Sequence, residues 1–213
     1  MTTYQFTPET FEIFSVSGLE ERMALITERV QPLFRYYGGQ VADYCQSHLQ
    51  DDSAMPVHVA KHLRRTKYAP DTTWVAVGGD KRGYKKYPHF QMVLNGDYVF
   101  VGLAIIDNPI YEKEIAKSFS KKIKFFQSLP QDFVVIPDHT DTAYIEQKDC
   151  DYKEVFERLE KVKKAEFMIG RVLDKQTAIK MTQEQVGKWV LETVDYLLEP
   201  YREAMSFYEE LGR

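Results

Sequence analysis

The chain has 213 residues, of which 44% are hydrophobic and 14% aromatic, and its formal net charge is −4. This composition supplies a sizeable core and excludes a disordered chain, which has few aromatic residues and a high net charge. No apolar run approaches the roughly 20 residues that a membrane-spanning helix needs, and the N-terminus, MTTYQFTPETF, lacks the basic and apolar regions of a secretory signal. We therefore expect one cytoplasmic domain, residues 1–213, without a membrane partner.

The first quarter of the chain is predicted to be helical. Thr7 and Pro8 are typical of an N-cap followed by proline at the first helical position, which starts a short helix through about Phe14. Apolar residues then recur every three or four positions over 18–48, which indicates one face of a long helix. Pro32 should bend this helix, because proline removes a hydrogen-bond donor and crowds the preceding turn.

Four strands are predicted in the middle of the chain. They span residues 55–65, 73–77, 89–94 and 98–106. Asn95-Gly96-Asp97 between the last two is a strong signal for a hairpin turn. The short polar connections predict that neighbouring strands run antiparallel.

The rest of the chain alternates between predicted helices and strands. Helices are predicted over 109–127, over 151–162 and from Thr182 onward with a bend at Pro200, and strands over 133–136, 143–146 and 165–173. Asp174 is a candidate cap for one short turn. The pattern predicts an α+β fold, in which a single antiparallel or mixed sheet of about six strands packs against long N- and C-terminal helices.

Residues 61–86 invert the charge of the chain, with eight basic and two acidic side chains. The basic residues are Lys61, Arg64, Arg65, Lys67, Lys81, Arg82, Lys85 and Lys86, and aromatic rings such as Trp74, Tyr84 and Tyr87 lie among them. A local inversion of this kind indicates an anionic partner, and a solvated charged loop accounts for it equally well.

His58 and His62 have two interpretations. On a helix, two histidines four residues apart share a face and can chelate a metal ion. On a strand, the same two histidines lie roughly 13 Å apart, which is too far for both to bind one ion. Pro56, Val57 and Val59 favour the strand, so we expect no metal site here.

The strand interpretation predicts a polar face of the sheet. His58, Ala60, His62 and Arg64 would point to one side of the first strand, as His89 and Gln91 would on the third. This face is either a floor for a ligand beneath the basic loop or an exposed surface whose side chains are solvated separately.

His139 follows a predicted strand, within Pro137-Asp138-His139-Thr140-Asp141. A histidine beside carboxylates in such a loop is either a general base or a turn residue. The patterns GxxxxGK[ST] and GxGxxG are absent from the sequence, so a P-loop or dinucleotide-binding fold is not predicted.

Several of these segments resemble the YktB-like family of Gram-positive bacteria related to Bacillus. The resemblance extends from about Phe6 to Tyr201 and is carried by GLEERM (18–23), VHVAKHLRRT (57–66), KRGYKKYPHFQ (81–91), DHT (138–140) and VKKAE (162–166). It implies a single α+β domain. The family has no established activity, so the resemblance assigns no catalytic residue.

Three functional hypotheses follow from the residues. The first is binding of a phosphate-bearing ligand, either an anionic small molecule or nucleic acid, without a cofactor or metal. The ligand-binding candidates are His58, His62, Arg64, Arg65, Lys81, Arg82, Tyr84, Lys85, His89 and Gln91. The second is an enzyme that acts on a phosphorylated or carboxylated metabolite with a histidine acid/base. The third is a protein–protein adaptor.

Overall fold

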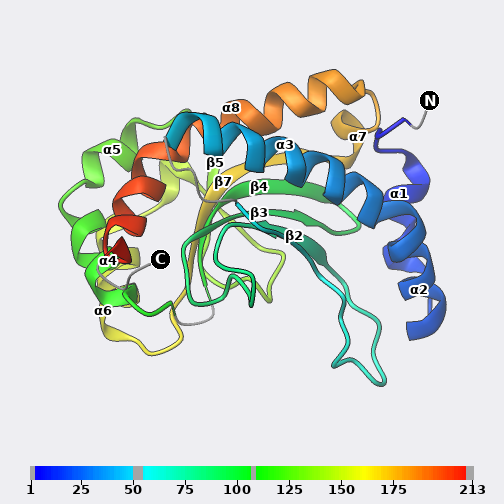
Figure 1. The fold of residues 1–213 in the computed structure, drawn as a ribbon, viewed down its shortest axis with the longest axis horizontal. Coiled ribbons are helices and arrows are strands. Elements are labelled where there is room, and N and C mark those ends of the chain that lie inside the picture. Colours follow the sequence, from blue (N-terminus) through cyan, green and yellow to red (C-terminus); the bar gives the residue numbers. More distant parts are fainter. Residues whose placement is uncertain (1–2, 50–54, 107–108, 210–213) are drawn as a thin grey trace.

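The computed structural model describes residues 3–49, 55–106 and 109–209, and it contains one seven-stranded antiparallel sheet (Figure 1). The strand order is β1-β2-β3-β4-β7-β5-β6. The bounds are β1 Val57–Val59, β2 Thr73–Val77, β3 His89–Leu94, β4 Tyr98–Ile105, β5 Phe133–Ile136, β6 Ile145–Glu146 and β7 Phe167–Asp174. The predicted α+β class with a single sheet is confirmed, with seven strands instead of about six.

In the N-terminal quarter, the last three helical elements follow one another without a gap from Leu19 to Leu49 and contain one widened turn, whereas Gly18, with a φ of 98°, separates them from the first two. The elements are α1 Pro8–Glu12, the 3₁₀ turn η1 Ile13–Ser15, α2 Leu19–Leu25, the π-helical turn η2 Ile26–Val30 and α3 Gln31–Leu49. The π turn ends two residues before Pro32. Because Pro32 has no N–H to continue the i to i−4 ladder, a wider turn immediately before it accommodates the missing bond.

Helices cover one face of the sheet. Figure 1 shows α3 and α8, Gln183–Ser206, side by side over the strands, and α4, Glu112–Ser120, with α5, Ile123–Ser128, and α6, Tyr152–Lys161, at the end that carries β5 and β6. The short helix α7, Lys175–Ala178, follows β7. A Cβ atom at Gly38 would lie 2.9 Å from Cγ1 of Val57, so α3 packs closely against the β1–β2 pair. No helix in the described ranges is long and apolar enough to cross a membrane.

The predicted helix over 109–127 is wrong in its continuity. The structure contains two helices, α4 and α5, and Lys122 between them leaves helical geometry with φ −115° and ψ 23°. Its ammonium group forms ion pairs with Glu199 and Glu203 of α8. Phe119 of α4 and Phe126 of α5 both pack against Phe156 of α6, so the break leaves the apolar side of both helices in the core.

The predicted first strand over 55–65 is also wrong in its extent, because β1 ends at Val59. After Ala60 donates its N–H to the carbonyl oxygen of Trp74, at 2.9 Å, the chain leaves the sheet. The neighbouring strand β2 begins only at Thr73, and Pro70 ahead of it has no N–H to offer a ladder. Residues 61–65 therefore have no strand partner, and His62 adopts a positive φ of 49°.

The second face of the sheet is largely covered by loops. Its apolar cluster includes Phe100 and Ala104 of β4, Ile136 of β5 and Met168 of β7. The loop 137–144 folds over this cluster, held by a 2.8 Å hydrogen bond from the Tyr98 hydroxyl to the carbonyl oxygen of Thr142. Of the polar residues predicted from strand alternation, His58, His89 and Gln91 lie on this same side, away from α3 and α8.

Candidate functional site

His58, Gln91 and His89 share the loop-covered face of the sheet. In the strand register, His58 of β1 lies opposite Ala76 of β2, and Ala76 lies opposite Gln91 of β3. His89 is two residues from Gln91 on the same strand, so its side chain points to the same side. The small side chain of Ala76 leaves space between the two flanking polar residues.

His89 is a structural residue of this face. Its side chain is fully buried, with Nδ1 2.9 Å from the carbonyl oxygen of Tyr87 and Nε2 3.0 Å from the side-chain amide of Gln91. Burial lowers the pKa of His89 to about 4, so the ring is neutral at pH 7. Both ring nitrogens already have protein partners. His89 therefore supports the face and does not offer a free hydrogen-bonding atom to a ligand.

The basic loop between β2 and β3 folds back over this face and inserts Tyr84. The Tyr84 ring lies 4.7 Å from the ring of His89 and 5.6 Å from that of His58, and its hydroxyl accepts a 2.7 Å hydrogen bond from Nε1 of Trp74. A protein side chain thus occupies the space between the two histidines. Nε2 of His58 is buried and has no hydrogen-bond partner among the described residues.

Asp80 holds this loop in a defined turn. Its carboxylate accepts the backbone N–H groups of Arg82, at 2.7 Å, and Gly83, at 3.1 Å, and the hydroxyl of Tyr87, at 3.1 Å. These hydrogen bonds lower the pKa of Asp80, so the carboxylate stays ionised. We call residues 79–87 the Tyr84 turn. The side chains of Lys81, Arg82, Lys85 and Lys86 are exposed on it.

His62 and Arg64 do not lie on the strand face, contrary to the prediction. They belong to a projecting segment, residues 60–71, that we call the arm. Nε2 of His62 is 3.1 Å from the hydroxyl of Thr73, and its ring packs edge-on against Trp74 at 5.1 Å. Burial, followed by the charge of Arg65, lowers the pKa of His62 to about 4. Arg64 and Arg65 are exposed on the arm.

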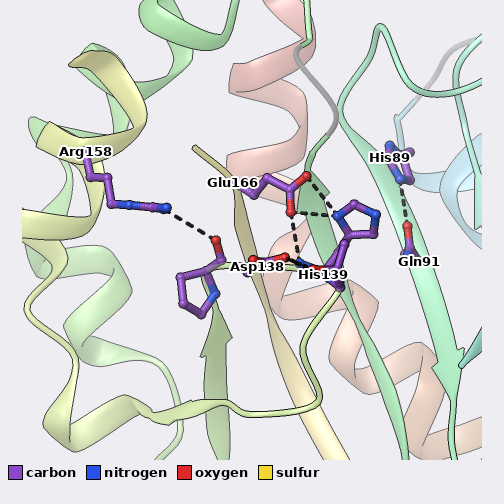
Figure 2. A network of polar contacts seen from close by, with 8 residues as sticks. His89, Gln91, Asp138, His139, Arg158 and Glu166 are labelled. Carbon is purple, nitrogen blue, oxygen red and sulfur yellow. Dashed lines mark hydrogen bonds and ion pairs between the residues drawn. The ribbon is translucent and has the colours of Figure 1, made fainter. Parts of the chain in front are cut away.

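His139 is paired with Glu166, a residue that the sequence analysis did not single out. Nδ1 of His139 lies 2.7 Å from Oε2 of Glu166, and the backbone N–H of His139 donates to the same oxygen at 2.9 Å. Glu166 immediately precedes β7, and its side chain is 11% exposed. Figure 2 shows the His139 ring between Glu166 and the His89–Gln91 pair. A carboxylate that holds one ring nitrogen fixes the orientation of the imidazole, as general bases require.

His139 is at the same time a turn residue, as the alternative prediction stated. Oδ1 of Asp138 accepts the backbone N–H and the hydroxyl of Thr140, at 2.9 and 2.6 Å. Asp138, His139 and Glu166 have potential metal-ligand atoms within 4.8 Å of one another. The direct hydrogen bonds among these residues and their turn account for that approach.

A small pocket connects these groups. Its lining residues are Thr72, Trp74, Gln91, Val93, Tyr98, Ile136, His139, Asp141 and Met168. It lies on the loop-covered face, with the base of the arm, the indole of Trp74 and the oriented imidazole of His139 around it. It combines an apolar floor with a few polar groups, but its volume of about 10 Å³ admits one water molecule, so only a single small group of a ligand fits into it.

Glu112 adds a half-buried acid close to Glu166. Burial, and then the negative charge of Glu166, raise the pKa of Glu112 to about 7. Its Oε1 is buried without a hydrogen-bond partner in the part of the chain that the structure describes. The strand and helix periodicity gave no signal for Glu112 or Glu166. The VKKAE string that carries part of the family resemblance does contain Glu166.

Comparison with known proteins identifies relatives along almost the whole chain. Residues 6–201 match the model of the family described as a domain of unknown function, DUF1054. A UPF0637 protein of Enterococcus faecalis is 40% identical over 205 residues, which cover 94% of this chain and 98% of that protein. A UPF0637 protein of Oceanobacillus iheyensis is 36% identical over 205 residues, 96% of this chain and 98% of the relative. A UPF0637 protein of Listeria monocytogenes is 40% identical over 172 residues, 81% of this chain and 83% of the relative. In agreement with the resemblance to YktB-like proteins, the chain belongs to the uncharacterised DUF1054/UPF0637 family.

Proposed function

We propose that this chain binds a phosphate-bearing ligand on the loop-covered face of the sheet, between the Tyr84 turn and the pocket beside His139. The observation that carries the proposal is the contact of Tyr84 with His58, His89 and Trp74. Through this contact, a turn with four exposed cations is fixed beside a polar, aromatic face. Arginine binds phosphate oxygens in bidentate fashion, and lysine adds positive charge.

The local charge balance supports an anion at the turn. Asp80 is the acid within the turn, and its carboxylate is already satisfied by the backbone of Arg82 and Gly83 and by Tyr87. Lys81, Arg82 and Lys86 form no ion pair with a carboxylate in the described ranges. An anion arriving from solvent therefore meets cations that are not committed to protein carboxylates.

A thermal-shift screen with nucleotides, phosphorylated metabolites and short oligonucleotides tests this proposal, because a ligand of the folded state raises the melting temperature by mass action. The double variant Arg82→Ala, Lys85→Ala should lose most of any shift. The variant Lys121→Ala, Lys124→Ala removes the same charge from exposed positions beside α5 and should keep it. Equal shifts in the two variants would refute the role of the turn.

The pairing of His139 with Glu166 favours a second function, acid/base catalysis on a phosphorylated or carboxylated metabolite. The Glu166 carboxylate holds Nδ1 and so fixes the orientation of the His139 ring, which lines the pocket. Turnover of a metabolite identified in the screen should show a titrating group between about pH 6 and 8. His139→Asn should abolish turnover and leave binding at the Tyr84 turn intact. Full activity in that variant would exclude the catalytic function.

A further inference from the structure

We infer that the phosphate-bearing ligand is a single-stranded nucleic acid, and that the arm, residues 60–71, binds the part of its backbone that extends beyond the Tyr84 turn. The inference rests on the proposed function and assigns its ligand class. It follows from the way in which the fold divides the basic residues into two groups with aromatic rings between them.

The arm carries four uncommitted positive charges. Lys61, Arg64, Arg65 and Lys67 are exposed, and none forms an ion pair with a carboxylate that the structure describes. Asp71, the acid of the arm, is paired with Arg22 at 3.1 Å. In a chain of net charge −4, such a segment attracts a polyanion locally while the remainder of the surface repels it.

The base of the arm is fixed to the body of the protein. Arg22 is 8% exposed and donates hydrogen bonds to the carbonyl oxygens of Val16, at 2.9 Å, and Pro70, at 2.8 Å. On the other side of the arm, the N–H of Ala60 bonds to Trp74. The cations are therefore presented on a preformed loop, which lowers the entropy lost when a ligand binds.

Aromatic side chains connect the arm with the Tyr84 turn. Tyr68 is 69% exposed at the arm, and Nζ of Lys67 lies 5.0 Å from the centre of its ring. Trp74 contacts both His62 at the base of the arm and Tyr84 of the turn. Cationic groups that follow a backbone, combined with aromatic rings that stack on bases, are the features that bind single-stranded nucleic acids.

The placement of the two basic groups favours a ligand with several phosphates in succession. The arm precedes Thr73 and the turn follows Val77, at opposite ends of β2. At about 3.3 Å per residue these ends lie roughly 13 Å apart. Figure 1 shows both loops on the side of the sheet opposite α3 and α8. Tyr84 of the turn reaches back to Trp74, next to Thr73, so aromatic rings lie between the two loops, and a strand of several nucleotides can place successive phosphates along this side.

Fluorescence anisotropy with labelled ten-nucleotide oligo(U) and oligo(dT) tests the inference, with ADP as a compact competitor. Both oligonucleotides carry the same number of phosphates, so their comparison shows whether RNA or DNA is preferred. Each phosphate contact contributes about −0.7 to the slope of log affinity against log salt for single strands. Arg64→Ala, Arg65→Ala should reduce the magnitude of that slope by about 1.4 and weaken oligonucleotide binding roughly tenfold or more in 50 mM salt. The affinity for ADP should not change.

The matched control is again Lys121→Ala, Lys124→Ala, which should leave both affinities unchanged. If the arm variant binds the oligonucleotides like the wild type while Arg82→Ala, Lys85→Ala binds them weakly, the arm inference is wrong and the proposed function stands. If the wild type binds ADP but no oligonucleotide, the arm inference is likewise wrong and the proposed function stands. Binding of neither ligand overturns both proposals. Arm-dependent binding to phosphatidylglycerol vesicles without oligonucleotide binding overturns the inference in favour of a lipid surface.

Discussion

His89 should make the stability of this protein fall as the pH is lowered from 7 to 5. Its ring is fully buried, and burial lowers its pKa from 6.5 to about 4. The folded protein therefore holds the neutral ring throughout this range, whereas the unfolded chain takes up a proton below about pH 6.5. Stability from this group is present above pH 6.5 and is lost as the pH falls toward 4.

The size of the effect follows from the two pKa values. Linkage between a pKa of about 4 in the folded state and about 6.5 in the unfolded state gives a loss of about 2 kcal/mol between pH 7 and pH 5. Full burial of the ring means that solvent screening does not reduce this figure substantially. In a protein of ordinary stability, 2 kcal/mol is a large fraction of the free energy of unfolding.

Urea denaturation of the wild type and of His89→Gln at pH 7 and pH 5 measures the effect. The variant should be less stable at pH 7, because it loses the packed ring and its hydrogen bond to Tyr87. Its loss on going to pH 5 should be smaller than that of the wild type by about 2 kcal/mol. Groups that titrate in both proteins cancel in this comparison. His48→Gln changes an exposed histidine and serves as the control.

An equal pH 7-to-5 loss in the wild type and His89→Gln would refute the reasoning. A second measurement does not depend on the stability of the variant. In the wild type, the NMR signals of the His89 ring should not titrate between pH 8 and pH 5. A midpoint near 6.5 would show that burial does not keep this ring neutral.

Three further predictions concern other described contacts. Gly170→Ala should destabilise the protein by about 3 kcal/mol in urea denaturation, because its Cβ would overlap the carbonyl oxygen of Val101; a wild-type midpoint would contradict this. Tyr98→Phe should cost about 1 kcal/mol in the same assay and increase proteolysis of the loop at Thr142, whose carbonyl loses its donor. The pKa of Glu112 is raised from 4.5 to about 7, so its stabilising contribution is lost as the pH rises through this window. Glu112→Gln should therefore lose less stability than the wild type between pH 5 and pH 8, and parallel profiles would exclude the raised pKa.

Most elements could be predicted where local sequence determines them. The bounds of β2, β3 and β5 agree with the prediction to the residue, because each is a short apolar run between turn residues. Asp151, Asp174 and Thr182 cap helices as predicted, since their side chains accept backbone N–H groups of the first turn. These signals need no information from distant parts of the chain.

The errors arise where distant residues decide the outcome. The chain over 55–65 has β-forming residues, but only Val57–Val59 finds a partner in β2. The division of the helix over 109–127 coincides with the ion pairs of Lys122 to α8, far away in the sequence. A pairing partner that ends early, or a carboxylate on another helix, leaves no mark in the local pattern.

The candidate site was predictable in its residue types and not in its arrangement. Alternation placed His58, His89 and Gln91 on one face, and the register agrees. The burial of His89 depends on how the Tyr84 turn folds back, which sequence periodicity does not report. Glu166 is 27 residues from His139, and their contact follows from the pairing of β5 with β7. The uninterrupted apolar run of β4 was a usable sign that both faces of the sheet are covered.

The sheet ends on both sides in its shortest described strands, β1 with three residues and β6 with two. A long free margin would present a row of unpaired backbone groups on which a second molecule could extend the ladder. Here each edge strand offers only two or three residues for pairing. The cations of the arm, next to β1, repel the arm of a second copy that approaches this edge. This construction should keep the protein from polymerising through its margins at high concentration, even though its interior strands are almost entirely apolar.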